Sequence, residues 1–312
     1  MAVNEKIAIL GGTGFLGKNV VQVLSQGDKY EVSSCSRRTG VDIRDYSKIE
    51  EFLKAGFDTV INCAAHVGGI AYNEMKPIEV FEDNVQIGMN VVKACARTGV
   101  KNLINIMPNC TYPGNLDLYE EEKWWDGAIH ESVLTYGLPR KMMWGLCQAY
   151  IKKYDIKFIH IIFPNMYGPD DYFDPVQSHA LGALIHKIVE AKKKEYAFVD
   201  IWGTGRPVRE WLYVKDSALS ITRVLENRDN FVNNDIVNVG NGTGVSIKEL
   251  AYIIKEIVGW NGEFVFDISR KDGAMCKIFR NEKMERLLQW RPPTPLRDGI
   301  KETIDWYLKN HG

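Results

Sequence analysis

Glycines near the start of the chain have the spacing of a loop that holds a dinucleotide. The segment 6–17 reads KIAILGGTGFLG, in which a short apolar run ends at Gly11 and glycines recur at Gly14 and Gly17. Glycine permits a turn with positive φ and a close approach of the ligand, because no Cβ intervenes. The helix that follows offers free N–H groups to a pyrophosphate. A turn that binds nothing is the alternative, but the strand before it and the helix after it favour dinucleotide binding.

The residues after the second expected strand favour NADP(H). Tyr30 to Ser36 reads as that strand, and Arg37 and Arg38 follow it directly. An acidic residue at this place accepts a hydrogen bond from the ribose of NAD, whereas arginine pairs with the 2′-phosphate of NADP. Residues 32–41 cover the end of this strand and the turn after it, and none of them is acidic. We therefore expect NADP(H). A solvated basic turn is the alternative.

Two further segments complete the expected cofactor site. Asp42 and Ile43 lead toward the adenine ring, and small residues after the third strand let the backbone lie close to the cofactor. The expected contacts are Gly11, Thr13, Gly14, Phe15, Leu16, Gly17, Arg37, Arg38, Asp42, Ile43, Ala64 and Ala65.

Strands and helices alternate through the first part of the chain. A buried strand at 59–63 is followed by an amphipathic helix over 79–98 and a strand over 101–107. A second long helix opens at Tyr136, and a strand covers 158–163. This alternation predicts an α/β fold with a Rossmann-type, doubly wound parallel sheet.

The alternation breaks after this strand, which suggests a second region. We expect a cofactor-binding domain over 1–165, with its sheet completed by about 203–241. A smaller substrate-binding region then takes 166–202 and 242–312.

The composition excludes several classes of protein. The net charge is −1, with 45% hydrophobic and 25% charged residues, so we expect neither disorder nor nucleic-acid binding. No apolar run approaches the roughly 18–20 residues that a membrane span needs, and the start lacks a signal peptide. The 6 cysteines have no metal-binding spacing. We therefore expect no metal, reduced thiols and a cytoplasmic location.

Several strings in order make the chain resemble the GDP-L-fucose synthases among the extended short-chain dehydrogenases/reductases. Beside the glycine loop they are NCAAHVGGI at 62–70, NCTYP at 109–113, Tyr136, FPNMYGP at 163–169, SHALGALI at 178–185 and WGTGRPVREWLYVKD at 202–216. HVGGI and SHALGALI are more specific to this subfamily than the glycine loop is. The resemblance covers nearly the whole chain. It implies NADPH, a GDP-sugar substrate, 3,5-epimerisation with 4-reduction, and a homodimer packed through the two long helices.

The resemblance implies catalytic roles for three residues. Tyr136 matches the tyrosine whose phenol donates a proton to a C4 ketone or a hydrogen bond to the enolate. Cys110 and His179 match the base and the acid that move protons at C3 and C5. Those protons are acidic because they flank the ketone, and both side chains titrate near neutrality. The alternatives are a packing tyrosine, an inert buried thiol and a core or helix-capping histidine.

One departure from the family pattern lies four residues after the tyrosine. The family has Tyr-x-x-x-Lys, whereas this chain has Tyr136 followed by Arg140 and then Lys141. Residues i and i+4 share a helix face and i+5 is turned away, so we expect Arg140 to face Tyr136 as a catalytic and cofactor-binding residue. Arginine keeps the charge but does not release its proton, which argues against a lysine-type proton relay.

The second departure is the loss of a hydroxyl. The family has a serine four residues before Tyr112, at the position of Pro108, which has no donor. One lost hydrogen bond to a developing oxyanion costs about 2.7–4 kcal/mol. Asn109 and Thr111 are the two candidates to replace it.

The resemblance also implies contacts to the sugar nucleotide. Arg209 is expected at the diphosphate and Trp202 at the nucleotide, while Lys187 stands where the family has an arginine. The expected substrate-binding residues are Asn109, Asn165, Lys187, Trp202, Arg209 and Lys283. The alternatives are solvated lysines, a surface arginine, a turn asparagine and a core tryptophan.

Three functions remain open at this point. The first is an NADPH-dependent epimerase and reductase of a GDP-4-keto-6-deoxy hexose or heptose. The second is an epimerase that retains its cofactor without net reduction. The third is a nucleotide-binding regulatory protein whose catalysis has decayed. Cys110 and His179 argue against the third function, because a decayed site has no reason to keep both.

Overall fold

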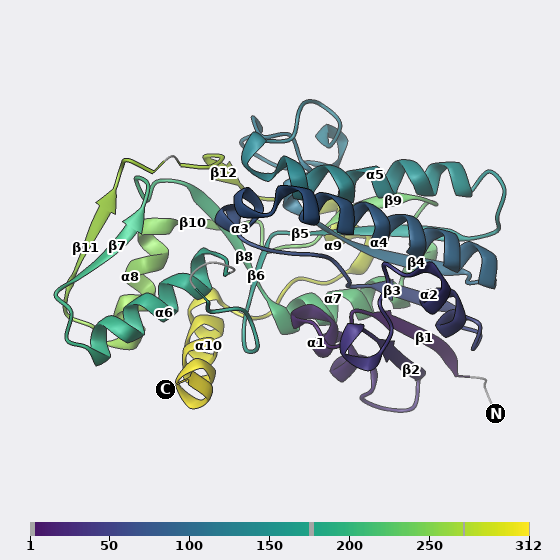
Figure 1. Ribbon diagram of the computed structural model, residues 1–312, viewed down its shortest axis with the longest axis horizontal. Coiled ribbons are helices and arrows are strands. Elements are labelled where there is room, and N and C mark those ends of the chain that lie inside the picture. The colour runs from purple at the N-terminus through teal and green to yellow at the C-terminus, as the bar shows by residue number, and fades with distance from the viewer. Residues whose placement is uncertain (1–3, 175–177, 271, 312) are drawn as a thin grey trace.

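Six parallel strands form the large sheet of the computed structural model, in the order β2-β1-β3-β4-β5-β9 (Figure 1). They are β1 (Glu5–Leu10), β2 (Tyr30–Cys35), β3 (Thr59–Asn62), β4 (Asn102–Pro108), β5 (Lys157–Phe163) and β9 (Asp235–Asn238). The structure describes residues 4–174, 178–270 and 272–311, so the expected domain bounds 1 and 312 lie outside it. The prediction of a Rossmann-type parallel sheet is confirmed.

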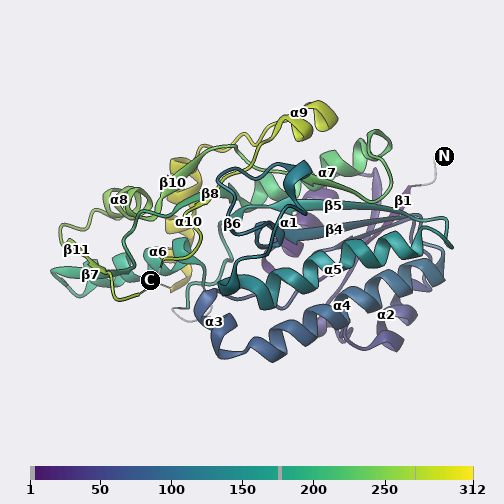
Figure 2. The same ribbon diagram turned by 90° about the horizontal axis from the view of Figure 1, so that it is seen from above.

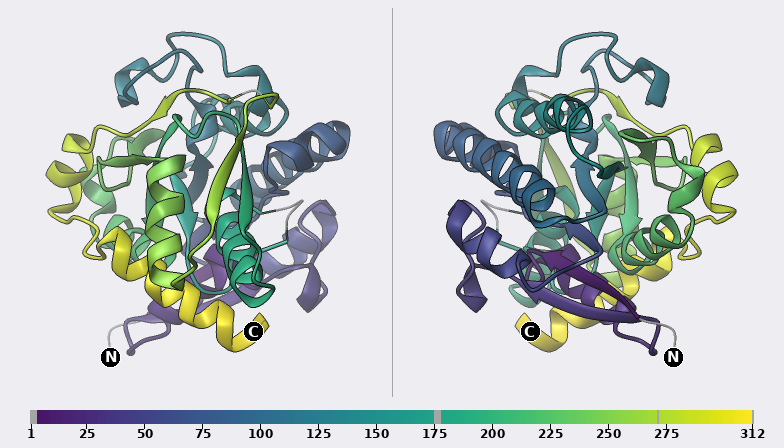
Figure 3. Two further views of the ribbon diagram at one scale, coloured as in Figure 1. Left: turned by 90° about the vertical axis from the view of Figure 1, so that its left-hand side faces the viewer. Right: turned by 90° about the vertical axis from the view of Figure 1, so that its right-hand side faces the viewer.

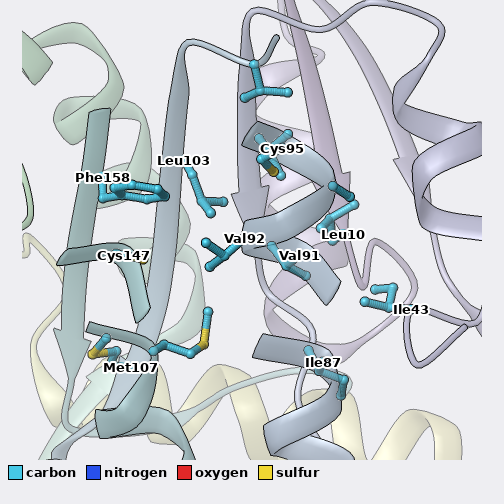
Figure 4. Packing of buried hydrophobic residues seen from close by; sticks show 14 of the residues in the cluster. Leu10, Ile43, Ile87, Val91, Val92, Cys95, Leu103, Met107, Cys147 and Phe158 are labelled. Atoms are coloured by element: carbon cyan, nitrogen blue, oxygen red, sulfur yellow. The ribbon is translucent and has the colours of Figure 1, made fainter. Parts of the chain in front are cut away.

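Helices cover both faces of this sheet (Figure 2). One face carries α2 (Tyr46–Leu53), α4 (Pro77–Thr98) and α5 (Leu134–Tyr150), and the other carries α1 (Phe15–Leu24), α7 (Val214–Glu226) and α9 (Glu282–Leu288). Successive side chains of a strand point to opposite faces. Ala8 and Leu10 therefore join the cluster under α4, which Figure 4 shows, whereas Ile7 and Ile9 join the cluster under α1 and α7.

The ends of the two long helices follow from local residues. Helix α4 has Pro77 at its first position, where the missing N–H has no partner in any case, and ends at Gly99 in the left-handed region. Helix α5 begins at Leu134, two residues before the expected start at Tyr136.

A smaller lobe forms the end of the molecule opposite the large sheet (Figure 1), and it faces the viewer in the left-hand view of Figure 3. Its strands are β6 (Asn165–Tyr167), β7 (Phe198–Trp202), β8 (Val208–Tyr213), β10 (Gly244–Ser246), β11 (Glu263–Asp267) and β12 (Cys276–Lys277), and its helices are α6 (Ala180–Lys193), α8 (Ile247–Val258) and α10 (Leu296–His311). Strand β8 pairs with β6, β10 and β12, and β7 pairs with β11. The lobe has a hydrophobic core of its own.

The segments 203–241 and 242–312 each contribute to both parts. Within the first segment, α7 and β9 join the large sheet, whereas β8 belongs to the small lobe. Within the second, α9 packs beside β9 on the large sheet. The chain therefore passes between the large sheet and the small lobe more often than the expected division predicts.

Short segments connect these elements at the carboxyl ends of the strands. They are α3 (Ile70–Met75) and the 3-10 turns η1 (Arg37–Thr39), η2 (Asn109–Thr111), η3 (Glu121–Lys123) and η4 (Glu131–Val133). A further 3-10 turn, η5 (Arg228–Asn230), lies between α7 and the start of β9. The chain leaves β1 for β2 on one side and returns to β3 on the other, so β1 and β3 border a topological switch point. Ligands of doubly wound sheets bind at this place.

Candidate active site

A cavity of about 1200 Å³ opens at the carboxyl ends of the large sheet and extends to the small lobe. All four residues expected to be catalytic line it, namely Cys110, Tyr136, Arg140 and His179. They come from η2, from two turns of α5 and from the residue before α6. The fold therefore brings together residues that lie up to 69 positions apart in the sequence.

The glycine loop closes tightly against the loop that follows β3. Gly11 has φ +79°, and a Cβ on it would lie 3.0 Å from the backbone of Ala64. Gly14 precedes α1 and supplies no side-chain cap, so the N–H groups at the start of this helix stay free for a ligand. Gly14, Phe15, Leu16 and Ala65 line the cavity. This cradle fits the pyrophosphate of a dinucleotide.

Two exposed arginines stand beyond this cradle. Arg37 and Arg38 are exposed and pair with no carboxylate of the described residues, whereas Arg44 is held by Asp42 at 2.6 Å and by Asp83 at 3.0 Å. Arg37 also lines the cavity. Unpaired guanidinium groups at this position suit a 2′-phosphate.

Other expected cofactor residues have structural partners. The side chain of Ile43 is buried in the core under α4, and Asp42 is tied to Arg44, so neither lines the cavity. The Thr13 hydroxyl donates to Ser36 at 2.9 Å and links the first and second strand ends. Gly11, Thr13, Gly17, Arg38 and Ala64 also lie outside the cavity lining. With Asp42 and Ile43, these seven expected contacts stay predictions.

Helix α5 lies directly against the turn that carries the cysteine. A Cβ on Gly137 would lie 2.3 Å from the carbonyl oxygen of Cys110, so only glycine permits this approach. Tyr136 precedes this glycine and lines the same cavity as Cys110. The expected tyrosine and the expected base therefore lie close together in the site.

Arg140 faces Tyr136 and Lys141 does not, as the helical spacing predicts. The buried Arg140 guanidinium donates to the carbonyl oxygen of Ala64 at 3.3 Å and to that of Ile106. Lys141 instead donates to the carbonyl oxygen of Trp124 on the far side of the helix. Burial raises the pKa of Tyr136 to about 12, although the charge of Arg140 opposes this shift. The phenol is thus protonated at neutral pH.

The turn after β4 decides between the two candidates for the missing hydroxyl. Thr111 donates to the carbonyl oxygen of Pro108 at 2.9 Å and accepts from the indole of Trp124 at 2.9 Å, away from the cavity. Asn109 lines the cavity, is 3% exposed, and its Nδ2 has no partner among the described residues. Of the two, Asn109 is the one placed to donate to a substrate oxygen.

Lys277, which was not among the expected site residues, lies near both the expected base Cys110 and the expected acid His179. The Nζ of Lys277 donates to the sulfur of Cys110 at 3.8 Å, and the thiol of Cys110 donates to Oδ1 of Asn109 at 3.5 Å. Burial lowers the pKa of His179 below its usual value, and the charge of Lys277 lowers it further. His179 is therefore neutral at pH 7.

The far end of the cavity holds the other expected substrate residues. Lys187 pairs with Asp200 at 2.8 Å and lies over the ring of Trp202, which is half exposed. The guanidinium of Arg209 donates to the carbonyl oxygen of Val208 and pairs with no described carboxylate. Asn165 lines the cavity as well. A cation and an exposed aromatic face suit a nucleoside diphosphate.

Lys283 does not line the cavity, and its expected role in substrate binding stays a prediction. Its Nζ pairs with Asp235 at 2.6 Å and donates to the carbonyl oxygen of Ile236 at 2.7 Å. These contacts tie α9 to β9 on the large sheet and neutralise the charge of Lys283 in this structure.

Sequence reasoning missed Lys277 and a network of polar side chains that line the cavity. In this network His66 contacts Asp83 and the hydroxyl of Tyr72, each at 2.8 Å. Lys277 belongs to a two-residue strand whose pairing with β8 has no local signal. The string HVGGI pointed to the segment of His66, but its partner on α4 depends on the tertiary fold.

The described ranges contain neither a metal-binding cluster nor a membrane-spanning helix. No cluster of three or more histidine, cysteine or acidic side chains there could hold a metal ion. In the same part of the chain, no helix has the length and apolar character to cross a membrane. The six cysteines all lie in the described ranges and are free thiols.

Known proteins resemble this chain over nearly its full length. Residues 7–240 match the family described as the NAD dependent epimerase/dehydratase family. The GDP-L-fucose synthase of Sinorhizobium fredii is 33% identical over 308 residues, which cover 98% of this chain and 96% of that protein. A GDP-6-OMe-4-keto-L-xylo-heptose reductase from C. jejuni has a TM-score of 0.90 at 28% identity, with 99% of both chains covered. A GDP-L-fucose synthetase from Naegleria fowleri bound to NADP has a TM-score of 0.87 at 28% identity, with 100% of this chain and 95% of that chain covered.

Proposed function

This chain belongs to the NAD dependent epimerase/dehydratase family, and we propose that it epimerises and reduces a GDP-4-keto-6-deoxy sugar with NADPH. It is a sugar-nucleotide epimerase/reductase of the GDP-L-fucose synthase type. The observation that carries the proposal is the cavity in which Cys110, His179 and Tyr136 meet below the glycine loop. The similarity to both a fucose synthetase and a heptose reductase leaves a hexose and a heptose as substrates to be compared.

The dinucleotide is NADP(H), which supplies the hydride for C4 of the sugar. The chain holds its pyrophosphate with the free N–H groups after Gly14 and its 2′-phosphate with Arg37 and Arg38. Arg140 would bind the nicotinamide ribose from α5, and its charge lies near Tyr136.

The sugar lies between Cys110 and His179 during epimerisation. The sulfur of Cys110 takes a proton from the carbon next to the ketone, and the electron pair of the C–H bond moves to the C4 oxygen. The imidazolium form of His179 returns a proton on the opposite face. Asn109 Nδ2, which has no partner of its own in the described chain, donates to the developing oxyanion.

Reduction uses Tyr136 and Arg140, the residues of α5 that line the same cavity. The phenol of Tyr136 is protonated at neutral pH, because burial raises its pKa to about 12. It therefore donates its proton to the C4 oxygen as the hydride arrives. The adjacent charge of Arg140 stabilises the phenolate that remains.

We also propose a homodimer formed through α4 and α5. Both helices lie on the same face of the sheet and pack side by side (Figure 2). Their outer surfaces expose Met89, Leu138 and Met142. Large apolar side chains on neighbouring turns are typical of an interface between subunits. The cytoplasmic location stays a prediction.

The proposal is tested with GDP-4-keto-6-deoxy-mannose and its 6-hydroxylated heptose counterpart as substrates. We expect one NADPH to be oxidised for each 4-hydroxy sugar formed, with inverted stereochemistry at C3 and C5 in the proton NMR spectrum. Inversion without NADPH oxidation favours the second candidate function, for which Pro108 is the supporting observation because it removes a donor. Binding of NADPH without turnover of either sugar contradicts both.

A further inference from the structure

Lys277 is a buried cation that the proposed function leaves without a role. It lies on β12, in register with Arg209 on β8, and lines the cavity. Its side chain is 8% exposed. Lys187 and Lys283 each pair with an aspartate, but Lys277 pairs with no carboxylate of the described residues. A buried ammonium is costly unless an anion lies nearby.

The sulfur of Cys110 is the group whose negative charge can balance the ammonium of Lys277. It lies 3.8 Å from Nζ of Lys277, and this hydrogen bond is the one that the structure gives to the ammonium within the described chain. The thiolate, and not the thiol, is the form of cysteine that accepts a proton, and a lysine beside the sulfur favours that form. An ion pair between them gives Lys277 an anionic partner, and the thiolate of Cys110 then no longer donates to Oδ1 of Asn109.

We propose that Lys277 is a positioning residue for epimerisation, whose ammonium holds Cys110 as the thiolate that removes protons at C3 and C5. The sugar in this statement rests on the proposed function, whereas the ion pair is a property of the free protein. During proton removal an S–H bond forms and a C–H bond breaks. The negative charge moves from sulfur to the C4 oxygen, and the ammonium keeps its proton.

Four charged or titratable side chains face Cys110, and they come from different elements. They are Lys277 from β12, Arg209 from β8, Tyr119 from the segment before η3 and Tyr136 from α5. Burial raises the pKa of both tyrosines, so they are neutral near pH 7. Arg209 acts in the same direction as Lys277, but its guanidinium donates to a backbone carbonyl and not to the sulfur. Lys277 is therefore the cation in contact.

His179 does not supply the positive charge. Burial and the nearby Lys277 both lower its pKa, so the imidazole is uncharged at pH 7. A thiolate stabilised by an imidazolium, as in a cysteine–histidine pair, is thus not the arrangement of this site. A fixed cation at Lys277 lets Cys110 be ionised while His179 exchanges its proton with water.

Iodoacetamide alkylation of the full-length protein tests the ion pair without any substrate. Lys277→Met removes the charge at similar length, and Lys277→Arg keeps the charge. Mass spectrometry of the Cys110 peptide gives the rate, and the Cys63 peptide serves as an internal reference. At pH 7 we expect Lys277→Met to slow alkylation of Cys110 at least about tenfold and Lys277→Arg to stay within about threefold of the wild type. In Lys277→Met the rise of the rate with pH should also move to higher pH.

Lys187→Met is the matched control, because it removes a cation of the same cavity that pairs with Asp200 and not with the sulfur. We expect it to leave alkylation of Cys110 unchanged. Equal rates in Lys277→Met and the wild type overturn the proposal. A raised KM for the GDP-sugar with unchanged alkylation assigns Lys277 to substrate binding instead. If the wild type turns over no keto sugar but Lys277→Met still slows alkylation, the proposed function fails and the ion pair stands.

Discussion

The two walls of the cavity differ in how they are built. The proton-transfer wall combines Cys110 from η2, His179 from the start of α6 and Lys277 from β12. The reduction wall places Tyr136 and Arg140 on one helix, beside the end of β4 at Pro108. Side chains from distant segments make the first wall, whereas residues within two turns of α5 dominate the second.

The walls also differ in how closely they follow the expected chemistry. Cys110 and His179, the proposed base and acid, both line the cavity, with a cation added at Lys277. In the reduction wall an arginine replaces the usual lysine and a proline replaces a hydroxyl donor. Asn109 has an unpaired Nδ2 within the described chain, and the buried guanidinium of Arg140 donates to backbone carbonyl oxygens. We infer that reduction in this protein depends more strongly on Tyr136 than it would with the lysine and the serine of the family pattern.

Loss of the Tyr136 hydroxyl should have the largest effect. Tyr136→Phe removes the proton donor of the reduction wall, and we expect NADPH oxidation to fall about 10³-fold. NADPH binding, measured by fluorescence, should change little, because the cradle is formed by the glycine loop. Reduction at the wild-type rate contradicts the assignment of the tyrosine.

A smaller effect is expected from the proton-transfer wall. Cys110→Ser replaces the base by a hydroxyl that is rarely ionised, so deuterium entry from heavy water at the first epimerised carbon should slow about 10²-fold. Reduction of a keto sugar that is already epimerised serves as the control and should persist. An unchanged exchange rate would remove Cys110 from the mechanism.

The two walls should respond differently to pH. Burial raises the pKa of Tyr136 to about 12, so the phenol stays protonated and reduction should vary less than about twofold between pH 6 and 8.5. Burial lowers the pKa of His179, so its proton-donating form grows only as the pH falls below the usual 6.5. The exchange profile should therefore show a break below pH 6.5 that His179→Asn abolishes. A common profile for both reactions argues against separate walls.

Replacement of the arginine should have a modest effect. Arg140→Lys keeps a cation on the face of α5 that holds Tyr136, so reductase activity should be preserved or raised by about threefold. Steady-state NADPH oxidation measures it, and deuterium exchange serves as the control. Complete loss of reduction shows that the guanidinium has a role of its own, for example through its bond to the carbonyl of Ala64.

The smallest effect on catalysis is expected from the outer surface of the reduction wall. Met142 on α5 is 49% exposed and belongs to the surface proposed for the dimer. Met142→Glu should convert a dimer into a monomer in light scattering, because a buried charge opposes association. An exposed change such as Lys152→Glu is the control. A monomeric wild type contradicts the proposed interface.

The parts of the site that depend on local spacing were predictable from the sequence. Arg140 lies four residues after Tyr136, and helical geometry alone places it on the same face with Lys141 turned away. The glycine loop likewise follows from its own spacing, since Gly11 needs a positive φ at the turn. Parallel strands with alternating buried side chains also follow from local pattern.

Residues that depend on strand pairing were not predictable. Lys277 and Lys283 lie six positions apart, yet one lines the cavity and the other ties α9 to Asp235. The difference arises because β12 pairs with β8, and nothing in two residues specifies that partner. The expected contact of Asp42 with the cofactor stays a prediction; its partner Arg44 also pairs with Asp83 on α4, which only the tertiary fold brings near. Tertiary contacts therefore decide which of several charged residues faces the substrate.

Deuterium exchange without NADPH tests the central claim most directly. The wild-type protein is incubated in heavy water with GDP-4-keto-6-deoxy-mannose and no reductant, and the sugar is read by mass spectrometry and proton NMR. The account predicts deuterium at C3 and C5 with the ketone retained, because the wall of Cys110 and His179 works without the wall of Tyr136. A sugar that leaves the incubation with no deuterium at either carbon contradicts it.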